Sequence, residues 1–185
     1  MLRLTTLDAI EAAVWIELSR AVRDKAHAWR TPVLATVDGS VSPPRADART
    51  VVLREVDEAQ RRLVFFTDSR SLKAAQMAAN PNATVVFWSP ALNWQLRCDV
   101  ALSIDVDSPA VASRWARIQS SVAASDYLSF AAPGSPLDGA ARPPLDQHHF
   151  AVVTAQVHAI DWLELDPTGH RRARLCCTDR CWLQP

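Results

Sequence analysis

The sequence predicts an α+β fold in which an antiparallel sheet or barrel of about six strands is flanked by helices. Strand-like segments, rich in β-branched and aromatic residues, follow one another at the short spacing of hairpins. Two helical segments interrupt this pattern. The chain has 185 residues, of which 49% are hydrophobic and 22% charged. It can therefore bury a core, and we expect one domain spanning residues 1–185.

The first element expected is an amphipathic helix over residues 5–30. Thr5 and Asp8 can form a capping pair at its start, and Thr31-Pro32 ends it. Its apolar side chains recur at helical spacing, at Ile10, Val14, Leu18, Ala21 and Val22.

Strands occupy most of the remaining chain. Val33 to Val37 forms a short strand that Asp38-Gly39 closes, and a proline-containing loop covers residues 40–48. Further strands are expected at 49–56, 62–67, 83–88, 94–106, 150–165 and 171–177. Two more helices are expected at 69–79 and 108–124, and a loop or lid at 131–146.

Composition excludes several classes of function. Twenty basic and twenty acidic residues give a net charge of zero, which disfavours nucleic acid and anionic membranes as partners. No apolar run is long enough to span a membrane and the N-terminus lacks a signal-peptide core, so we expect a soluble, cytoplasmic protein. The four glycines form no nucleotide-binding loop. Neither the four cysteines nor His148-His149 has the spacing of metal ligands, and no metal is expected.

The stretch from Phe65 to Lys73 has the composition of an anion site. A strand ends, hydroxyl side chains gather, and a helix begins with Arg70 and Lys73 near its first turn. Cations oppose the helix dipole at this end, whereas exposed N–H groups, hydroxyls and cations together suit a phosphate. A capped helix whose two cations point into water explains the local sequence equally well.

The segment Arg49-Thr50-Val51-Val52-Leu53-Arg54 favours the anion site. An arginine stands at each end of an apolar strand, which suits a flat ring system attached to a phosphate. Taken alone, the segment also fits a core strand with solvated ends.

Three segments in this order resemble the pyridoxamine 5′-phosphate oxidase family of FMN-binding split barrels, and more closely its shorter, oxidase-related branch. They are RTVVLREVD, LVFFTDSRSLKAAQMAANPNATVVFW and WQLRCDVAL. The resemblance covers residues 30–106 and returns weakly at the C-terminal end. It implies a six-stranded antiparallel split barrel and a homodimer that binds FMN between its subunits.

The resemblance also implies roles for particular residues. Arg49 is expected to bind the FMN phosphate with Ser71 and Lys73, and Arg70 to supply a guanidinium where Leu72 replaces the family's arginine. Trp162 and Arg174 are expected to reach the cofactor from the other subunit. The complete set of expected cofactor-binding residues is Arg49, Thr50, Val51, Val52, Leu53, Phe66, Thr67, Arg70, Ser71, Leu72, Lys73, Gln95, Trp162 and Arg174.

Departures from the family pattern concern the substrate. Arg54 stands where the oxidase has lysine, and Arg171-Arg172-Ala173 lacks the histidine of the family's Arg-x-His motif. We therefore expect an FMN-dependent oxidoreductase whose small substrate contacts Arg54, Arg171 and Arg172, with no catalytic residue assigned. A flavin carrier, sensor or electron-transfer protein is the alternative, and F420 or pyridoxal phosphate is the alternative ligand.

Overall fold

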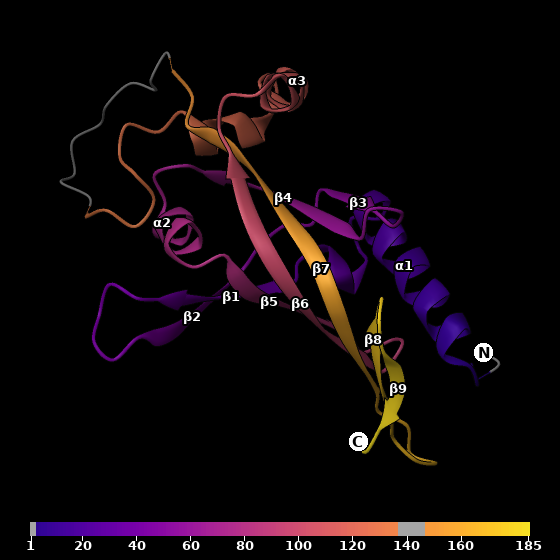
Figure 1. Ribbon diagram of the computed structural model, residues 1–185. Helices are drawn as coiled ribbons and strands as arrows, with labels where there is room; N and C mark the ends of the chain where they lie inside the picture. Colours follow the sequence, from indigo (N-terminus) through magenta and orange to yellow (C-terminus); the bar gives the residue numbers. More distant parts are fainter. Residues whose placement is uncertain (1–2, 137–146) are drawn as a thin grey trace.

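The computed structural model describes residues 3–136 and 147–185, and Figure 1 shows their arrangement. The fold is α+β, as the sequence predicts, with a large antiparallel sheet and few helices. Residues 137–146 of the expected loop at 131–146 lie outside the described residues. No helix in the described part of the chain is long and apolar enough to cross a membrane.

The sheet contains nine strands within the described ranges, so the expectation of six strands was too low. Seven form a continuous path in the order β2-β1-β5-β6-β7-β4-β3, which does not close, while β8 pairs with β7 and β9 with β8. The bounds are β1 Val33–Asp38, β2 Arg45–Thr50, β3 Glu55–Asp57, β4 Arg62–Asp68, β5 Asn82–Ser89, β6 Trp94–Asp105, β7 Phe150–Glu164, β8 Arg171–Cys176 and β9 Arg180–Leu183.

The helices are shorter than the sequence indicated. Helix α1 covers Leu7–Arg23, with Thr6 as its N-cap, and a separate 3₁₀ turn η1 covers Ala28–Arg30. The expected helix over 5–30 is therefore two elements. The other helical elements are α2 Leu72–Ala79, α3 Pro109–Ile118 and the 3₁₀ turn η2 Val122–Tyr127.

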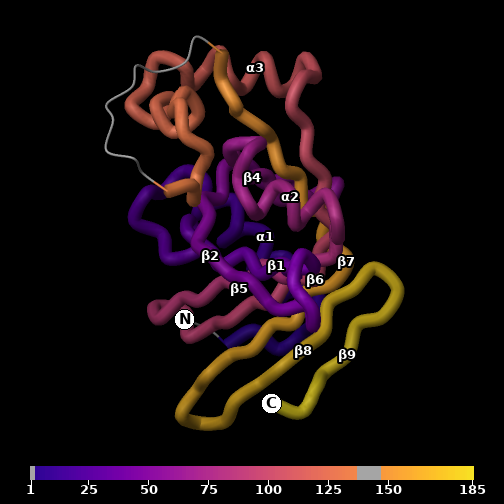
Figure 2. The backbone as a smooth tube through the Cα atoms, turned by 90° about the vertical axis from the view of Figure 1, so that its left-hand side faces the viewer, coloured from indigo at the N-terminus to yellow at the C-terminus, as the bar shows by residue number. Residues whose placement is uncertain are grey.

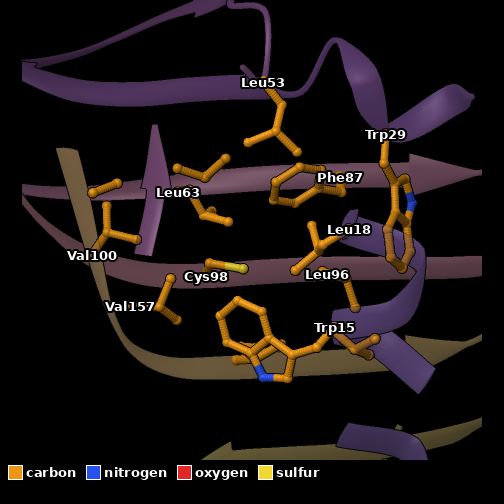
Figure 3. Packing of buried hydrophobic residues seen from close by; sticks show 14 of the residues in the cluster. Trp15, Leu18, Trp29, Leu53, Leu63, Phe87, Leu96, Cys98, Val100 and Val157 are labelled. Carbon is orange, nitrogen blue, oxygen red and sulfur yellow. The ribbon is translucent and has the colours of Figure 1, made fainter. Parts of the chain in front are cut away.

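The main core lies between α1 and the inner face of the sheet. Figure 3 shows Trp15 and Leu18 of α1 among side chains from the strands, including Phe87 and Leu96. The inward residues of β6 alternate with exposed ones, as expected for a sheet with one buried face. A second, smaller apolar cluster surrounds Phe150 near α3 and η2.

The expected strand at 49–56 is interrupted because the chain changes partners there. Residues up to Thr50 pair with β1, whereas the N–H of Arg54 donates to the Val64 carbonyl of β4 at 2.9 Å. Strand β2 therefore ends and β3 begins five residues later, at Glu55. The segment between them, residues 51–54, is extended and borders the candidate site.

Candidate functional site

Arg49 is held in a fixed orientation at the end of β2. Its Nη1 donates to Thr36 Oγ1 at 2.6 Å and to the Leu34 carbonyl at 3.3 Å. Its Nη2 donates to Asp47 Oδ2 at 2.5 Å and to Gln76 Oε1 at 2.9 Å. These partners come from β1, β2 and α2, so the guanidinium links the edge of the sheet to helix α2.

Lys73 lies in the first turn of α2 beside two buried hydroxyl groups. Its Nζ donates to Thr67 Oγ1 at 3.1 Å, and Thr67 Oγ1 lies 3.2 Å from Ser71 Oγ. Burial lowers the pKa of Lys73, and the positive charge of Arg49 lowers it further, against the opposing effect of Asp68. Two partly buried cations therefore act on each other at this point, an arrangement that a bound anion stabilises.

The turn between β4 and α2 places these groups. Asp68 is buried at the end of β4, and its Oδ1 accepts a hydrogen bond from the N–H of Arg70 at 2.8 Å. Ser71 then caps α2 with its backbone, while its side chain makes no cap hydrogen bond and stays beside Thr67. The next residue, Leu72, leaves 56% of its surface exposed.

The guanidinium of Arg70 binds groups of its own chain outside the cluster of Arg49 and Lys73. Its guanidinium binds both oxygens of Asp68, at 3.1 and 2.6 Å, and donates to the carbonyls of Ser129 and Phe130 at 2.9 and 3.2 Å. The bonds to Asp68 raise the pKa of Arg70. Its charge is thus compensated within the chain, and the side chain braces the segment that follows η2.

The extended segment 51–54 presents one free backbone donor. The N–H groups of Val51 and Leu53 donate to the carbonyls of Pro32 and Arg30, at 3.0 and 2.8 Å. For the N–H of Val52, which lies between them, no acceptor is found among the residues that the structure describes. Buried Leu53 anchors the segment in the core. A ligand beside this segment can therefore bind a backbone N–H.

Arg54 is a partly buried arginine for which the described residues supply no carboxylate partner. Its guanidinium carbon lies 5.5 Å from the centre of the Phe66 ring, and Phe66 packs edge-on against Phe150 at 4.9 Å. Its Nε is buried with no hydrogen-bond partner, and its guanidinium forms no ion pair with a carboxylate of the described residues. Nearby Tyr127 is buried, and this burial raises its pKa.

Gln95 and Trp162 lie on opposite faces of the sheet. Gln95 pairs with Trp88 on the outer face, where both are accessible. Trp162 has 0% exposure and packs against Trp94 and Trp182, with ring centres 5.5 and 6.5 Å away. The geometry does not support the expectation that Trp162 reaches a cofactor in the other subunit, because the ring is enclosed by its own chain.

The three arginines of β8 each face a carboxylate. Arg171 donates to Glu164 at 2.8 Å, and Arg172 binds both oxygens of Asp161 at 2.9 and 2.6 Å. Arg174 is more exposed and lies 3.7 Å from Asp99. Figures 1 and 2 show that β8 is remote from α2, so within one chain these arginines do not join Arg49 and Lys73.

A family model for the FMN-binding domain of pyridoxamine 5′-phosphate oxidase matches residues 12–104, half of the chain. The chain belongs to this pyridoxamine 5′-phosphate oxidase family. The matched segment contains Arg49, Lys73 and Gln95 and ends before β7 and β8. Family membership therefore supports the assignments around α2 more directly than those at the C-terminal end.

Curated relatives in the pyridoxamine 5′-phosphate oxidase family match only part of their own length. The chain is 36% identical over 93 residues to the pyridoxine/pyridoxamine 5′-phosphate oxidase of Anaeromyxobacter dehalogenans, covering 50% of the chain and 44% of that enzyme. It is 48% identical over 52 residues to the Thermosynechococcus vestitus enzyme, of which it covers 24%. The chain thus spans less than half the length of these relatives.

A solved structure shares the fold over the full length. A pyridoxamine 5′-phosphate oxidase-related, FMN-binding protein from Nostoc punctiforme superposes with a TM-score of 0.71, covering 100% of both chains at 24% identity. At this identity the likeness concerns the fold alone.

Three site residues were missed in the sequence: Thr36, Asp47 and Gln76. Two of them left a signal. Asp47 precedes Arg49 by two positions on a strand, and Gln76 follows Lys73 by three on a helix, so each shares a face with the predicted cation. Thr36 left none, because its position depends on the pairing of β1 with β2.

Proposed function

We propose that the chain binds FMN and acts as a flavin-dependent oxidoreductase on a small substrate. The observation that carries the proposal is the pair of partly buried cations, Arg49 and Lys73, beside the hydroxyls of Thr67 and Ser71. A phosphate dianion offsets both the burial of these charges and their mutual repulsion. Membership of a family defined by its FMN-binding domain supports this cofactor.

The residues present fit a phosphate group. Lys73 provides a cationic donor, and the Ser71 hydroxyl is not consumed in capping its own helix. Each charge-assisted hydrogen bond contributes about 1.5–3 kcal/mol, so two or three of them hold the group firmly. Arg70 and Leu72, also expected here, contribute less: the first is paired with Asp68 and the second is apolar.

The segment from Thr50 to Leu53 is proposed to lie along the flavin ring. Its free donor is the N–H of Val52, and Phe66 and Thr67 flank the same region on β4. Gln95 is accessible on the outer face of the sheet. When bound, FMN supplies the capacity to accept a hydride, while the chain binds and orients the ring.

The substrate proposed for this site carries a negative charge. Arg54 is partly buried, has no carboxylate partner in the described ranges and rests on the Phe66 ring. A buried cation without a counter-charge is unfavourable, and an anionic substrate removes this cost. Arg171 and Arg172, the other expected contacts, already bind Glu164 and Asp161 and must exchange partners to take part.

A homodimer is part of the proposal. Apolar side chains are accessible on the outer face of β1 and β5, at Val33 (37% exposed) and Trp88 (43% exposed). Val33 pairs with Val86, and Trp88 pairs with Gln95, so all four lie on one face. Covering this face with a second copy buries apolar surface and brings Arg174 of one subunit toward the cofactor of the other.

A flavin carrier without turnover is the second candidate. It is favoured by the carboxylate pairing of Arg171 and Arg172, which leaves Arg54 as the unpaired arginine expected to contact a substrate. Anaerobic mixing of the FMN-loaded protein with pyridoxamine phosphate or NADPH separates the two. Bleaching of the flavin absorbance by either compound supports the oxidoreductase, and bleaching by dithionite alone supports the carrier.

FMN titration followed by flavin fluorescence tests the cofactor site. Arg49→Ala and Lys73→Ala are expected to raise the FMN dissociation constant at least tenfold each, which corresponds to about 1.4 kcal/mol. Riboflavin, which lacks the phosphate, is expected to bind the variants and the native chain equally.

Arg62→Ala is the matched control, because Arg62 is exposed on β4 and makes a side-chain contact to Gln156 rather than to the site. It should leave FMN binding unchanged. Unaltered FMN titrations for both Arg49→Ala and Lys73→Ala contradict the phosphate assignment.

A further inference from the structure

Asp47 is a carboxylate inside a site built from cations. It lies two residues before Arg49 on β2, opposite Thr36. Its Oδ2 accepts hydrogen bonds from Arg49 Nη2 at 2.5 Å and from Gln76 Nε2 at 2.8 Å. The bond from Gln76 lowers the pKa of Asp47, and the charge of Arg49 contributes in the same direction, so the group is ionised at neutral pH.

The terminal nitrogens of Arg49 are fully used within the chain. Each carries two hydrogens: Nη1 serves Leu34 and Thr36, and Nη2 serves Asp47 and Gln76. A phosphate that binds Arg49 through a terminal nitrogen must therefore replace one of these four acceptors.

The four acceptors differ in how readily each can move away from the Arg49 guanidinium. The Leu34 carbonyl belongs to β1, and the side chains of Thr36 and Gln76 are buried, with 3% and 4% of their surface exposed. The side chain of Asp47 is 36% exposed on an edge strand, so it can turn toward water. It is also the acceptor that repels an incoming dianion.

We infer that Asp47 is an internal counter-ion of the phosphate site, which neutralises Arg49 in the free protein and yields its place at Nη2 to a bound phosphate. This inference rests on the proposed function. Without a ligand, Asp47 stabilises the partly buried guanidinium. With a ligand, the same carboxylate opposes binding, so the chain holds its cofactor less tightly than the cations alone allow.

The variant Asp47→Asn tests this role, because it keeps the shape and an acceptor oxygen while removing the charge. FMN is expected to bind about tenfold more tightly, equivalent to about 1.4 kcal/mol. Inorganic phosphate should compete with FMN at correspondingly lower concentrations. Riboflavin affinity should not change, since riboflavin has no phosphate to meet the carboxylate.

Glu58→Gln is the control for net charge. It removes one negative charge from an exposed turn between β3 and β4, away from Arg49, and should leave FMN binding unaltered. Asp47→Ser provides a second variant with the same expected direction, in case the amide distorts β2.

Two failures can be told apart. If the native chain does not bind FMN at micromolar concentration, the proposed function is wrong. If the native chain binds FMN but both Asp47 variants bind it equally or more weakly, with riboflavin binding intact, Asp47 only positions Arg49 and the inference is overturned.

Discussion

Lys73 carries the least compensated positive charge at the site around α2. Its described hydrogen bond goes to a neutral hydroxyl, on Thr67, and the nearby carboxylate of Asp68 is already paired with Arg70. Arg49, by contrast, contacts a carboxylate directly. The two cations are therefore not equivalent: Arg49 is a fixed and neutralised group, whereas Lys73 retains a charge that a ligand can satisfy.

The pH dependence of FMN affinity follows from the lowered pKa of Lys73. Above that pKa the free protein holds a neutral amine, and phosphate binding must take up a proton to restore the charge. FMN affinity is thus expected to fall with rising pH, beginning below the ordinary lysine pKa, and to be constant on the acidic side of the transition as far as this group is concerned. Fluorescence titrations across the alkaline range measure the fall.

Lys73→Arg is the comparison for this titration, because arginine keeps its charge throughout the range. In the variant, the decrease in FMN affinity with rising pH should lose the part caused by deprotonation of Lys73. Any part caused by titration of the flavin itself should remain. Identical pH profiles for the native chain and the variant show that Lys73 does not meet the phosphate as a cation.

At the scale of elements, the ends of the strands and helices depend on their pairing partners, which the sequence pattern does not reveal. Alternation and turn residues predict the strands, but the sequence of residues 49–56 gives no sign that pairing with β1 ends at Thr50 and that the backbone meets β4 from Arg54. Helix α1 likewise ends at Arg23, before the Thr31-Pro32 pair that was expected to end it. Nη1 of Arg30 donates to the carbonyl of Val22 at 2.8 Å, so a side chain from beyond the helix binds its last turn.

The candidate site also combines features that local sequence indicates with features that depend on tertiary packing. The proximity of Arg49 and Lys73 agrees with the expectation from a strand end, a helix start and the family resemblance, while their binding of a phosphate stays a prediction. The burial of Trp162 could not, since it depends on the β8–β9 hairpin packing Trp182 against it. The pairing of Arg70 with Asp68 is close in sequence, but whether it outcompetes a phosphate depends on the burial of Asp68.

Glu164 joins three elements at the end of β7 and provides a prediction at this scale. Its carboxylate accepts from Arg3 at 3.1 Å, from Arg171 at 2.8 Å and from Trp94 Nε1 at 3.3 Å. Glu164→Gln leaves the partly buried Arg171 without its counter-charge. We expect a loss of about 1–3 kcal/mol in the free energy of unfolding, measured by urea denaturation.

FMN affinity should be unchanged in this variant, because Glu164 pairs with β8 at the end of β7, and Figure 1 shows β8 remote from α2. Asp8→Asn is the matched control: Asp8 also pairs with an arginine, Arg180, but its side chain is 88% exposed. Surface pairs of this kind contribute little, so its denaturation midpoint should stay near the native value. Equal midpoints for the two variants contradict the structural role of Glu164.

At the scale of the whole molecule, the outer face of the sheet carries accessible apolar side chains. Val33, Val86, Trp88 and Gln95 share this face with the charged residues Arg97 and Asp161. An accessible apolar centre beside a charged rim is typical of an interface. The same face carries Gln95 and borders the segment proposed to lie along the flavin, so assembly and cofactor binding are expected to depend on each other.

Trp88→Glu tests this dependence, because a carboxylate at the centre of the proposed interface cannot be buried without a partner. The variant is expected to sediment as a monomer and to bind FMN at least tenfold more weakly. The native protein is expected to lose FMN affinity to the same extent when it is diluted until it dissociates into monomers. Val122→Glu is the control, since Val122 is 94% exposed on η2, away from the sheet face. Analytical ultracentrifugation with detection at the flavin absorbance measures mass and bound cofactor together. A monomeric Trp88→Glu chain that keeps native FMN affinity would show that one subunit completes the site, and Arg174 would then have no role in a neighbour's cofactor.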